Sequence, residues 1–390
     1  MNRSSQQTHW QRCAAWGFLL LVFLAINADV LRRPLKHTTM PTYRLAATQW
    51  WLGHDPYNSE RAHDAFLYFP QAAVIFTPFN VLPFSLGEIL WRAVTFGLFV
   101  YALLRLTKVF LSNGTASSGK TFLILSLLAV PSSFASLRNA QFDLPLAALV
   151  VLAAMEIARS RWNIATLWLS LAIALKPLAV VPLLLFGALY WKLIPRLVAG
   201  LLVVVAIPFL HWNPLFVAHE YVRCFETLIW AAKADEARYS DLAALISHIG
   251  IYPPDWLKTI VRIIFALIYL GLGFAAIRRL SRISAAWTIG ALSADYLMLF
   301  NPRTETCSYV FLGPFVASLA LLYAQKPERK WFSYFLGFAA LCLACDAFPY
   351  IHNLTDRWLK PLIALLFLPI LIELIFARRS SVTRPTVPPG

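Results

Sequence analysis

The chain has 390 residues, of which 59% are hydrophobic and only 14% are charged. Soluble globular domains carry about 25% charged residues, so this composition excludes a soluble globular protein and predicts a polytopic membrane protein. The formal net charge of +15 would suggest a nucleic-acid partner in a soluble protein. Here it is divided among short clusters of the kind that mark cytoplasmic loops, so we expect contact with membrane lipids and no nucleic-acid partner.

Hydrophobic segments follow one another along most of the chain. A transmembrane helix needs about 20 mostly apolar residues, and the segments that approach this length are 13–30, 86–106, 121–137, 144–158, 195–211, 259–277, 284–300, 309–324, 331–349 and 359–377. A further apolar stretch at 163–191 is interrupted by Lys176-Pro177, which predicts a hairpin of two short arms. Together these segments predict an all-α membrane protein with about 12 transmembrane helices.

Basic residues set the expected orientation of these helices. With a cytoplasmic N-terminus, the short basic clusters all fall on the cytoplasmic side if 163–191 is a hairpin. We therefore predict one transmembrane domain at 1–379 and a disordered cytoplasmic tail at 380–390. Both termini would be cytoplasmic, and the protein would lie in a bacterial inner membrane. Two long loops, 29–83 and 212–258, are then expected on the extracytoplasmic side.

Three cations lie at the extracytoplasmic ends of the predicted helices, namely Arg138, Lys176 and Arg303. Charged residues at membrane depth are costly and often mark a functional site. Three cations that meet near one leaflet would suit a phosphate group, to which arginine offers bidentate pairing. The alternative for each one alone is a side chain that extends to nearby lipid phosphates. We interpret the three together as a phosphate-binding set.

Carboxylates on the same side are candidates for a general base, which must lie within hydrogen-bond reach of the hydroxyl that it activates. Asp29 lies at the end of the first predicted helix, and Asp55 lies in a turn flanked by aromatic residues. Asp55 is equally well explained as a turn residue before Pro56. Glu305 is interpreted as the counter-ion of its neighbour Arg303.

The second long loop offers no metal site. The histidines and acids between residues 211 and 248 have no spacing typical of a compact metal-binding motif, so an amphipathic helix at the membrane surface is the preferred interpretation. Cys342-x-x-Cys345 lies inside an apolar segment, which favours packing over redox or metal chemistry. No metal or other cofactor is predicted, since nothing in the sequence supports a divalent cation.

A series of short motifs resembles glycosyltransferase family 87. In the first loop these are Tyr43-x-x-Ala46-Ala47, Trp51-x-Gly53-x-x-Pro56-Tyr57, Tyr68-x-Pro70, Pro78, Leu82-Pro83 and, beyond it, Trp91. Further along they are Asn139-x-Gln141, Lys176-Pro177, Asn301-Pro302-Arg303 and Ser308-Tyr309. Their order and placement, more than any single motif, carry the resemblance, which spans roughly residues 29 to 314.

The resemblance implies a membrane enzyme of the C-type glycosyltransferase superfamily. Such enzymes transfer a sugar from a polyprenyl phosphate to a lipid or glycan acceptor at the extracytoplasmic face, with inversion, and an acid in the first outer loop acts as the base. Family members often have an aspartate four residues before the tyrosine that matches Tyr43, whereas this chain has Thr39. The base would then be Asp29 or Asp55.

The sequence thus predicts a hexosyltransferase, with mannose as the first choice of sugar. Arg138, Lys176 and Arg303 would stabilise the leaving phosphate. The residues expected to bind the sugar are Tyr43, Tyr57, Tyr68, Gln71, Asn139 and Gln141. Two alternatives remain at this stage: a lipid or solute transporter or flippase, and a non-catalytic subunit with the same fold.

Overall fold

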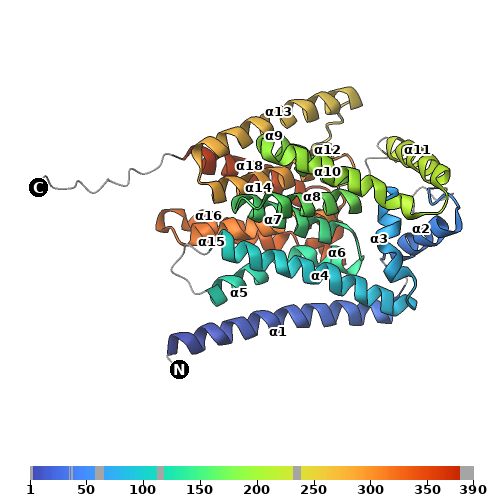
Figure 1. Ribbon diagram of the computed structural model, residues 1–390. Helices are drawn as coiled ribbons and strands as arrows, with labels where there is room; N and C mark the ends of the chain where they lie inside the picture. The colour runs from blue at the N-terminus through green and yellow to red at the C-terminus, as the bar shows by residue number, and fades with distance from the viewer. Residues whose placement is uncertain are drawn as a thin grey trace, which may run out of the picture.

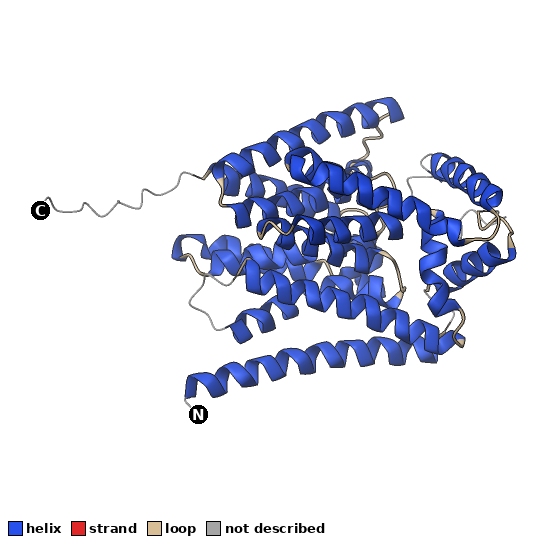
Figure 2. Cartoon of the chain, viewed as in Figure 1, coloured by secondary structure: helices blue, strands red, loops and turns tan. Residues whose placement is uncertain are grey.

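The computed structural model describes residues 3–34, 36, 38–57, 66–111, 118–231 and 239–377. Helices make up its regular structure, and Figure 2 shows no strand in the described part of the chain. The all-α prediction is therefore confirmed. The predicted disordered tail at 380–390 lies outside the described residues.

The helices are, in chain order, α1 Arg3–Arg32, α2 Met40–Leu52, α3 Pro70–Asn80, α4 Phe84–Val109, α5 Ser118–Ala129, α6 Phe134–Arg138, α7 Asp143–Ala158, α8 Trp162–Leu175, α9 Val180–Leu189, α10 Ile194–Ala206, α11 Pro214–Ala231, α12 Leu242–His248, α13 Asp255–Arg279, α14 Arg282–Phe300, α15 Gly313–Ala324, α16 Lys330–Cys342, α17 Pro349–Thr355 and α18 Leu359–Phe376. Short 3-10 turns join several of them, including η6 Thr306–Phe311 and η8 Cys345–Ala347.

Among the described residues, eight helical segments are long and apolar enough to cross a membrane. They are His9–Arg32, Phe84–Val109, Gly119–Arg138, Trp191–Leu210, Asp255–Arg279, Arg282–Phe300, Thr306–Ala324 and Leu359–Phe376. A pair bent by 110°, Pro327–Ala347 with Pro349–Thr355, would make nine. The predicted count of about 12 also includes α7, α8 and α9, which are shorter than this length, so that count is not confirmed.

Helix α7 forms the centre of the bundle (Figure 1). Every one of its residues, from Asp143 to Ala158, is buried, and its neighbours include α4, α8 and α14. Apart from Asp143 at its start and Glu156 near its end, its sequence is apolar on all sides, and a helix of that kind is stable only when other elements surround it.

The stretch 163–191 is a hairpin, as predicted. The rings of Trp162 and Tyr190 lie 5.9 Å apart, and Arg196 Nε donates to Asn163 Oδ1 at 2.8 Å, so the two arms begin and end at the same end of the bundle. Lys176 at the tip has an extended backbone with φ of −149°, the conformation favoured before a proline.

The bundle has two distinct ends. Helix α1 begins and α18 ends at one of them, the termini end, whereas α2, α3 and α11 gather at the opposite end, the loop end (Figure 1). Predicted cytoplasmic cations lie at the termini end: Arg329 forms an ion pair with Glu373, and the Arg279 guanidinium lies over Phe376 at 4.7 Å.

The turn 138–143, between α6 and α7, is hydrogen-bonded to two neighbouring side chains of α4. The fully buried Arg92 of α4 donates through Nε to the Leu137 carbonyl at 3.0 Å and through Nη2 to the Arg138 carbonyl at 2.8 Å. Trp91 Nε1 donates to the Ala140 carbonyl at 2.8 Å. Arg92 thereby satisfies carbonyls that the end of α6 leaves without helical partners.

We predict that Arg92→Met lowers the free energy of unfolding by about 3–5 kcal/mol, because it removes the donors that Arg92 gives to the Leu137 and Arg138 carbonyls and leaves the buried Glu88 carboxylate without its cation. Glu88 lies 3.5 Å from Arg92, so the double variant Glu88→Gln with Arg92→Met should recover part of this loss. Denaturant titration in mixed micelles measures both variants. Wild-type stability of the single variant would contradict this account of the turn.

Candidate functional site

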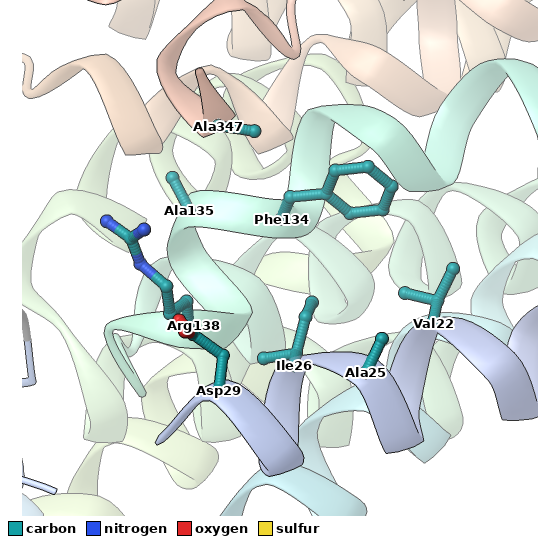
Figure 3. A pocket seen from close by; sticks show the side chains of 8 residues that line it. All are labelled: Val22, Ala25, Ile26, Asp29, Phe134, Ala135, Arg138 and Ala347. Carbon is teal, nitrogen blue, oxygen red and sulfur yellow. The ribbon is translucent and has the colours of Figure 1, made fainter. Parts of the chain in front are cut away.

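A cavity of 270 Å³ at the loop end brings together two of the predicted site residues (Figure 3). Asp29, at the end of α1, and Arg138, at the end of α6, both line it, and the rest of the lining is apolar. Asp29 is exposed and Arg138 is half-buried. The Arg138 Nε atom is buried and has no hydrogen-bond partner among the described residues. This cavity is therefore lined by one carboxylate and one guanidinium in otherwise apolar surroundings.

Asp55 serves a structural purpose in the same region. One carboxylate oxygen accepts from the Tyr57 backbone N–H at 2.7 Å, and the other accepts from Arg223 Nε at 3.0 Å. The first contact is an Asx turn, and the second joins the first loop to α11. The interpretation of Asp55 as a turn residue thus agrees with the geometry, because both oxygens already have donors.

Aromatic residues of the first loop pack against the turn 138–143. The hydroxyls of Tyr43 and Tyr68 are 3.0 Å apart, and Phe142 lies 4.6 Å from the Tyr43 ring and 4.9 Å from the Tyr68 ring. Burial raises the pKa of both phenols well above their ordinary value, so they act as neutral hydrogen-bonding groups. Tyr43 and Tyr57 are buried whereas Tyr68 is half-buried, so Tyr68 has the more accessible ring.

The three predicted amide ligands have different surroundings. Gln71 is buried and its Oε1 accepts from the Tyr221 hydroxyl at 3.2 Å. Asn139 is half-buried, and its Oδ1 has no partner among the described residues. Gln141 Nε2 donates to Glu305 Oε2 at 2.8 Å. Of the three, Gln141 is held most directly beside an acid.

An ion pair between Asp143 and Lys176 lies at the other side of the turn 138–143. Lys176 Nζ is 2.7 and 2.9 Å from the two Asp143 oxygens, and the Asp143 side chain is completely buried. Asp143 was not among the predicted site residues. Its signal in the sequence was an acid at the first position of a mostly apolar helix, where its charge also interacts favourably with the helix dipole.

Glu305 extends this pair into a polar cluster. The Cys307 thiol lies 2.7 Å from Gln141 Oε1 and 3.3 Å from Glu305 Oε2, while Glu305 itself is exposed. The interpretation of Glu305 as the counter-ion of Arg303 does not match the contacts. Arg303 instead donates to the Ala231 carbonyl at 3.2 Å and lies 5.3 Å from the Tyr239 ring.

The three predicted phosphate-binding cations therefore have separate immediate partners. Arg138 lines the cavity with Asp29, Lys176 pairs with Asp143, and Arg303 stacks on Tyr239. Their convergence on one phosphate stays a prediction. In the part of the chain that the structure describes, no group of three or more His, Cys, Asp or Glu is arranged to hold a metal ion.

Helix α11, in the second long loop, presents one buried face and one exposed apolar face. Val217, Glu220 and Cys224 are buried, while Leu215 and Phe225 are 80% and 55% exposed. This arrangement is typical of a helix at a membrane surface. Glu220 is buried beside Asp55, and this desolvation raises the pKa of its carboxyl to about 7 although His219, 3.1 Å away, opposes the shift.

A family comparison agrees with this combination of a helical membrane bundle and a polar site at one end. The chain matches the family model of glycosyltransferase family 87 over residues 66–302, more than half of its length. The protein is thus a membrane glycosyltransferase, and the chain belongs to glycosyltransferase family 87. No curated protein and no solved structure matches it. The matched region contains Arg138, Gln141 and Lys176, whereas Asp29 and Asp55 precede it.

We predict that Lys176→Met lowers the free energy of unfolding by about 3–5 kcal/mol, because it leaves the Asp143 carboxylate buried without a cation. The double variant Asp143→Asn with Lys176→Met should recover most of this loss, since it removes both charges. Arg223→Gln is the control: it breaks two ion pairs, with Asp55 and Glu226, of an arginine that is 37% exposed, and it should cost less than about 1 kcal/mol. Equal losses for Lys176→Met and Arg223→Gln would contradict a buried pair.

A second prediction concerns pH. Because the pKa of Glu220 in the folded chain is about 7, above its ordinary value, the folded state retains a proton that the unfolded state releases. Its contribution to stability is therefore present at low pH and is lost as the pH rises toward about 7. The melting temperature of Glu220→Gln relative to wild type should increase between pH 5 and pH 8.

The matched control is Glu226→Gln on the same helix, whose carboxylate is 56% exposed. Its melting temperature should keep a constant offset from wild type across the same pH range. A constant offset for Glu220→Gln as well would show that Glu220 does not titrate in this window.

Proposed function

We propose that this glycosyltransferase moves a hexose, with mannose as the first candidate, from a polyprenyl phosphate to a lipid or glycan acceptor. The acceptor hydroxyl would attack the anomeric carbon of the sugar, a carboxylate would take the hydroxyl proton, and the polyprenyl phosphate would leave. The observation that carries the proposal is the cavity in which Asp29 and Arg138 meet at the loop end.

The position of this cavity favours a lipid-linked donor. Its apolar lining comes partly from Val22, Ala25 and Ile26 of α1, a helix whose apolar side chains are largely exposed, such as Leu21 at 66% and Leu24 at 55%. An isoprenoid chain could therefore remain in the bilayer while its phosphate reached Arg138. The guanidinium suits a phosphate because it can donate two parallel hydrogen bonds.

The extracytoplasmic location rests on charge. Basic side chains at the termini end, including Arg279 and Arg329, indicate that this end faces the cytoplasm. The loop end would then face outward, in a bacterial inner membrane. Polyprenyl-phosphate sugars are suited to that face because the lipid carries both the sugar and its leaving group within the membrane.

Asp29 is the better candidate for the base. It lines a cavity and is exposed, whereas both oxygens of Asp55 accept hydrogen bonds from the protein. A general base must lie within hydrogen-bond reach of the substrate hydroxyl, which a position in a cavity allows. Arg138 would stabilise the negative charge that develops on the leaving phosphate, a type of interaction that is worth several kcal/mol in a site that excludes water.

The test is transfer of labelled mannose from a polyprenyl phosphate by the purified, reconstituted protein. Asp29→Asn should lower the rate by about 10²–10⁴, the usual contribution of a general base. Asp55→Asn should lower the rate by less than about tenfold, since it only weakens the contact with Arg223.

A third variant, Glu305→Gln, tests whether the exposed acid beside Gln141 acts as the base in place of Asp29. Loss of transfer in Glu305→Gln with retained transfer in Asp29→Asn would move the base to Glu305. Absence of transfer by the wild-type protein with several polyprenyl-phosphate sugars would argue against this donor class and for a different one within the family.

A further inference from the structure

A second cavity of 390 Å³ lies at the loop end between α12, the start of α13 and the end of α14. Its walls are mostly apolar and include Ile246, Val261 and Phe300. It shares no lining residue with the cavity of Asp29 and Arg138. The function proposed above does not use it.

Two cations line this second cavity. Lys258 and Arg262 are four residues apart on α13, so they lie on the same helix face. Lys258 Nζ is 3.0 Å from Asp255 Oδ1, but the Asp255 side chain is 97% exposed, so water screens that ion pair strongly. The cavity therefore presents positive charge beside apolar walls.

The acid in the cavity lining, Asp241, does not neutralise both cations. Its Oδ1 accepts from the Ala244 backbone N–H at 2.9 Å and so caps α12. Its Oδ2 is 4.0 Å from Arg262 Nη2, which is too long for a hydrogen bond. The guanidinium of Arg262 can therefore still donate to a ligand.

The depth of the cavity is marked by aromatic side chains. Tyr252 and Trp256 flank the start of α13 and are 75% and 65% exposed, as expected of aromatic anchors at the headgroup level of a bilayer. Lys258 follows Trp256 by two residues, yet its side chain is only 11% exposed. Its side chain is thus largely covered by the protein where it lines the cavity.

We propose that this cavity binds the headgroup of an anionic phospholipid from the surrounding leaflet. Lys258 and Arg262 pair with the lipid phosphate, and the fatty-acid chains contact Ile246, Val261 and Phe300. The combination of two cations with apolar walls at headgroup depth selects an amphiphile with a net negative charge. Binding does not involve glycosyl transfer, so the site stands independently of the sugar donor.

The bound lipid also has a structural consequence. Residue Ser240, next to the α12 cap, donates its N–H to the Thr304 carbonyl at 2.8 Å and accepts from the Tyr309 hydroxyl at 2.8 Å. A lipid that holds α12 against α13 therefore also holds the segment that carries Glu305.

The experiment measures binding of phosphatidylglycerol, phosphatidylcholine and water-soluble glycerol phosphate to the purified full-length chain by native mass spectrometry and by thermal shift. The expected result is saturable binding of phosphatidylglycerol, with the other two at least about tenfold weaker. The double variant Lys258→Gln with Arg262→Gln should weaken phosphatidylglycerol binding by about tenfold or more. Ile246→Trp should weaken it also, because the larger side chain fills the cavity without a change of charge.

The matched control is Lys36→Gln with Arg357→Gln, which removes two exposed cations at the loop end outside the cavity lining and should leave binding unchanged. A photoreactive phosphatidylglycerol should label peptides from α12 or α13. Binding that persists in both cavity variants, or that falls equally in the control, would overturn the proposal. Equal affinity for glycerol phosphate would do so as well, since it would reduce the site to a simple anion site.

Discussion

The hydrogen bonds from Arg92 to the end of α6 are the constraint on which the loop end depends. Buried carbonyls without donors cost free energy, and Arg92 supplies donors to two of them in succession. The chain can then leave α6, pass Ala140 in the left-handed region with φ of 58°, and begin α7 in the centre of the bundle. A fixed turn 138–143 follows from this arrangement.

The turn 138–143 carries functional side chains at both of its ends. Its first residue, Arg138, lines the cavity with Asp29, and its last residue, Asp143, forms the buried pair with Lys176. The residues between them contact the first loop and Glu305. A rigid support of this kind is what a transferase requires, because small displacements of groups around a transition state are costly.

Thr39 has a physical explanation in the same turn. Its backbone N–H and its hydroxyl both donate to the Asn139 carbonyl at 2.9 Å. An ionised aspartate at this position would have no side-chain proton to donate and would place a carboxylate against a carbonyl oxygen. Members of the family often have an acid at this position. In this chain Thr39 instead connects the start of α2 to the turn 138–143 through these two hydrogen bonds.

The sequence by itself determined the fold class and the hairpin at Lys176, because composition, apolar length and proline position act locally. The family followed from the order of the motifs along the chain. It also identified Asp29, Arg138, Gln141 and Lys176 as residues of interest from their places at helix ends. Span number was less predictable, since α7 to α9 are short and their burial depends on neighbouring helices.

Tertiary structure decided which of these residues meet. Lys176 forms an ion pair with Asp143, and Gln141 donates a hydrogen bond to Glu305. Asp29 and Arg138 line the same cavity, whereas Asp55 forms an ion pair with Arg223. These partners are separated by between 33 and 168 positions along the chain, and no local pattern encodes such contacts. They follow from the packing of the helices against one another, which only the folded bundle defines.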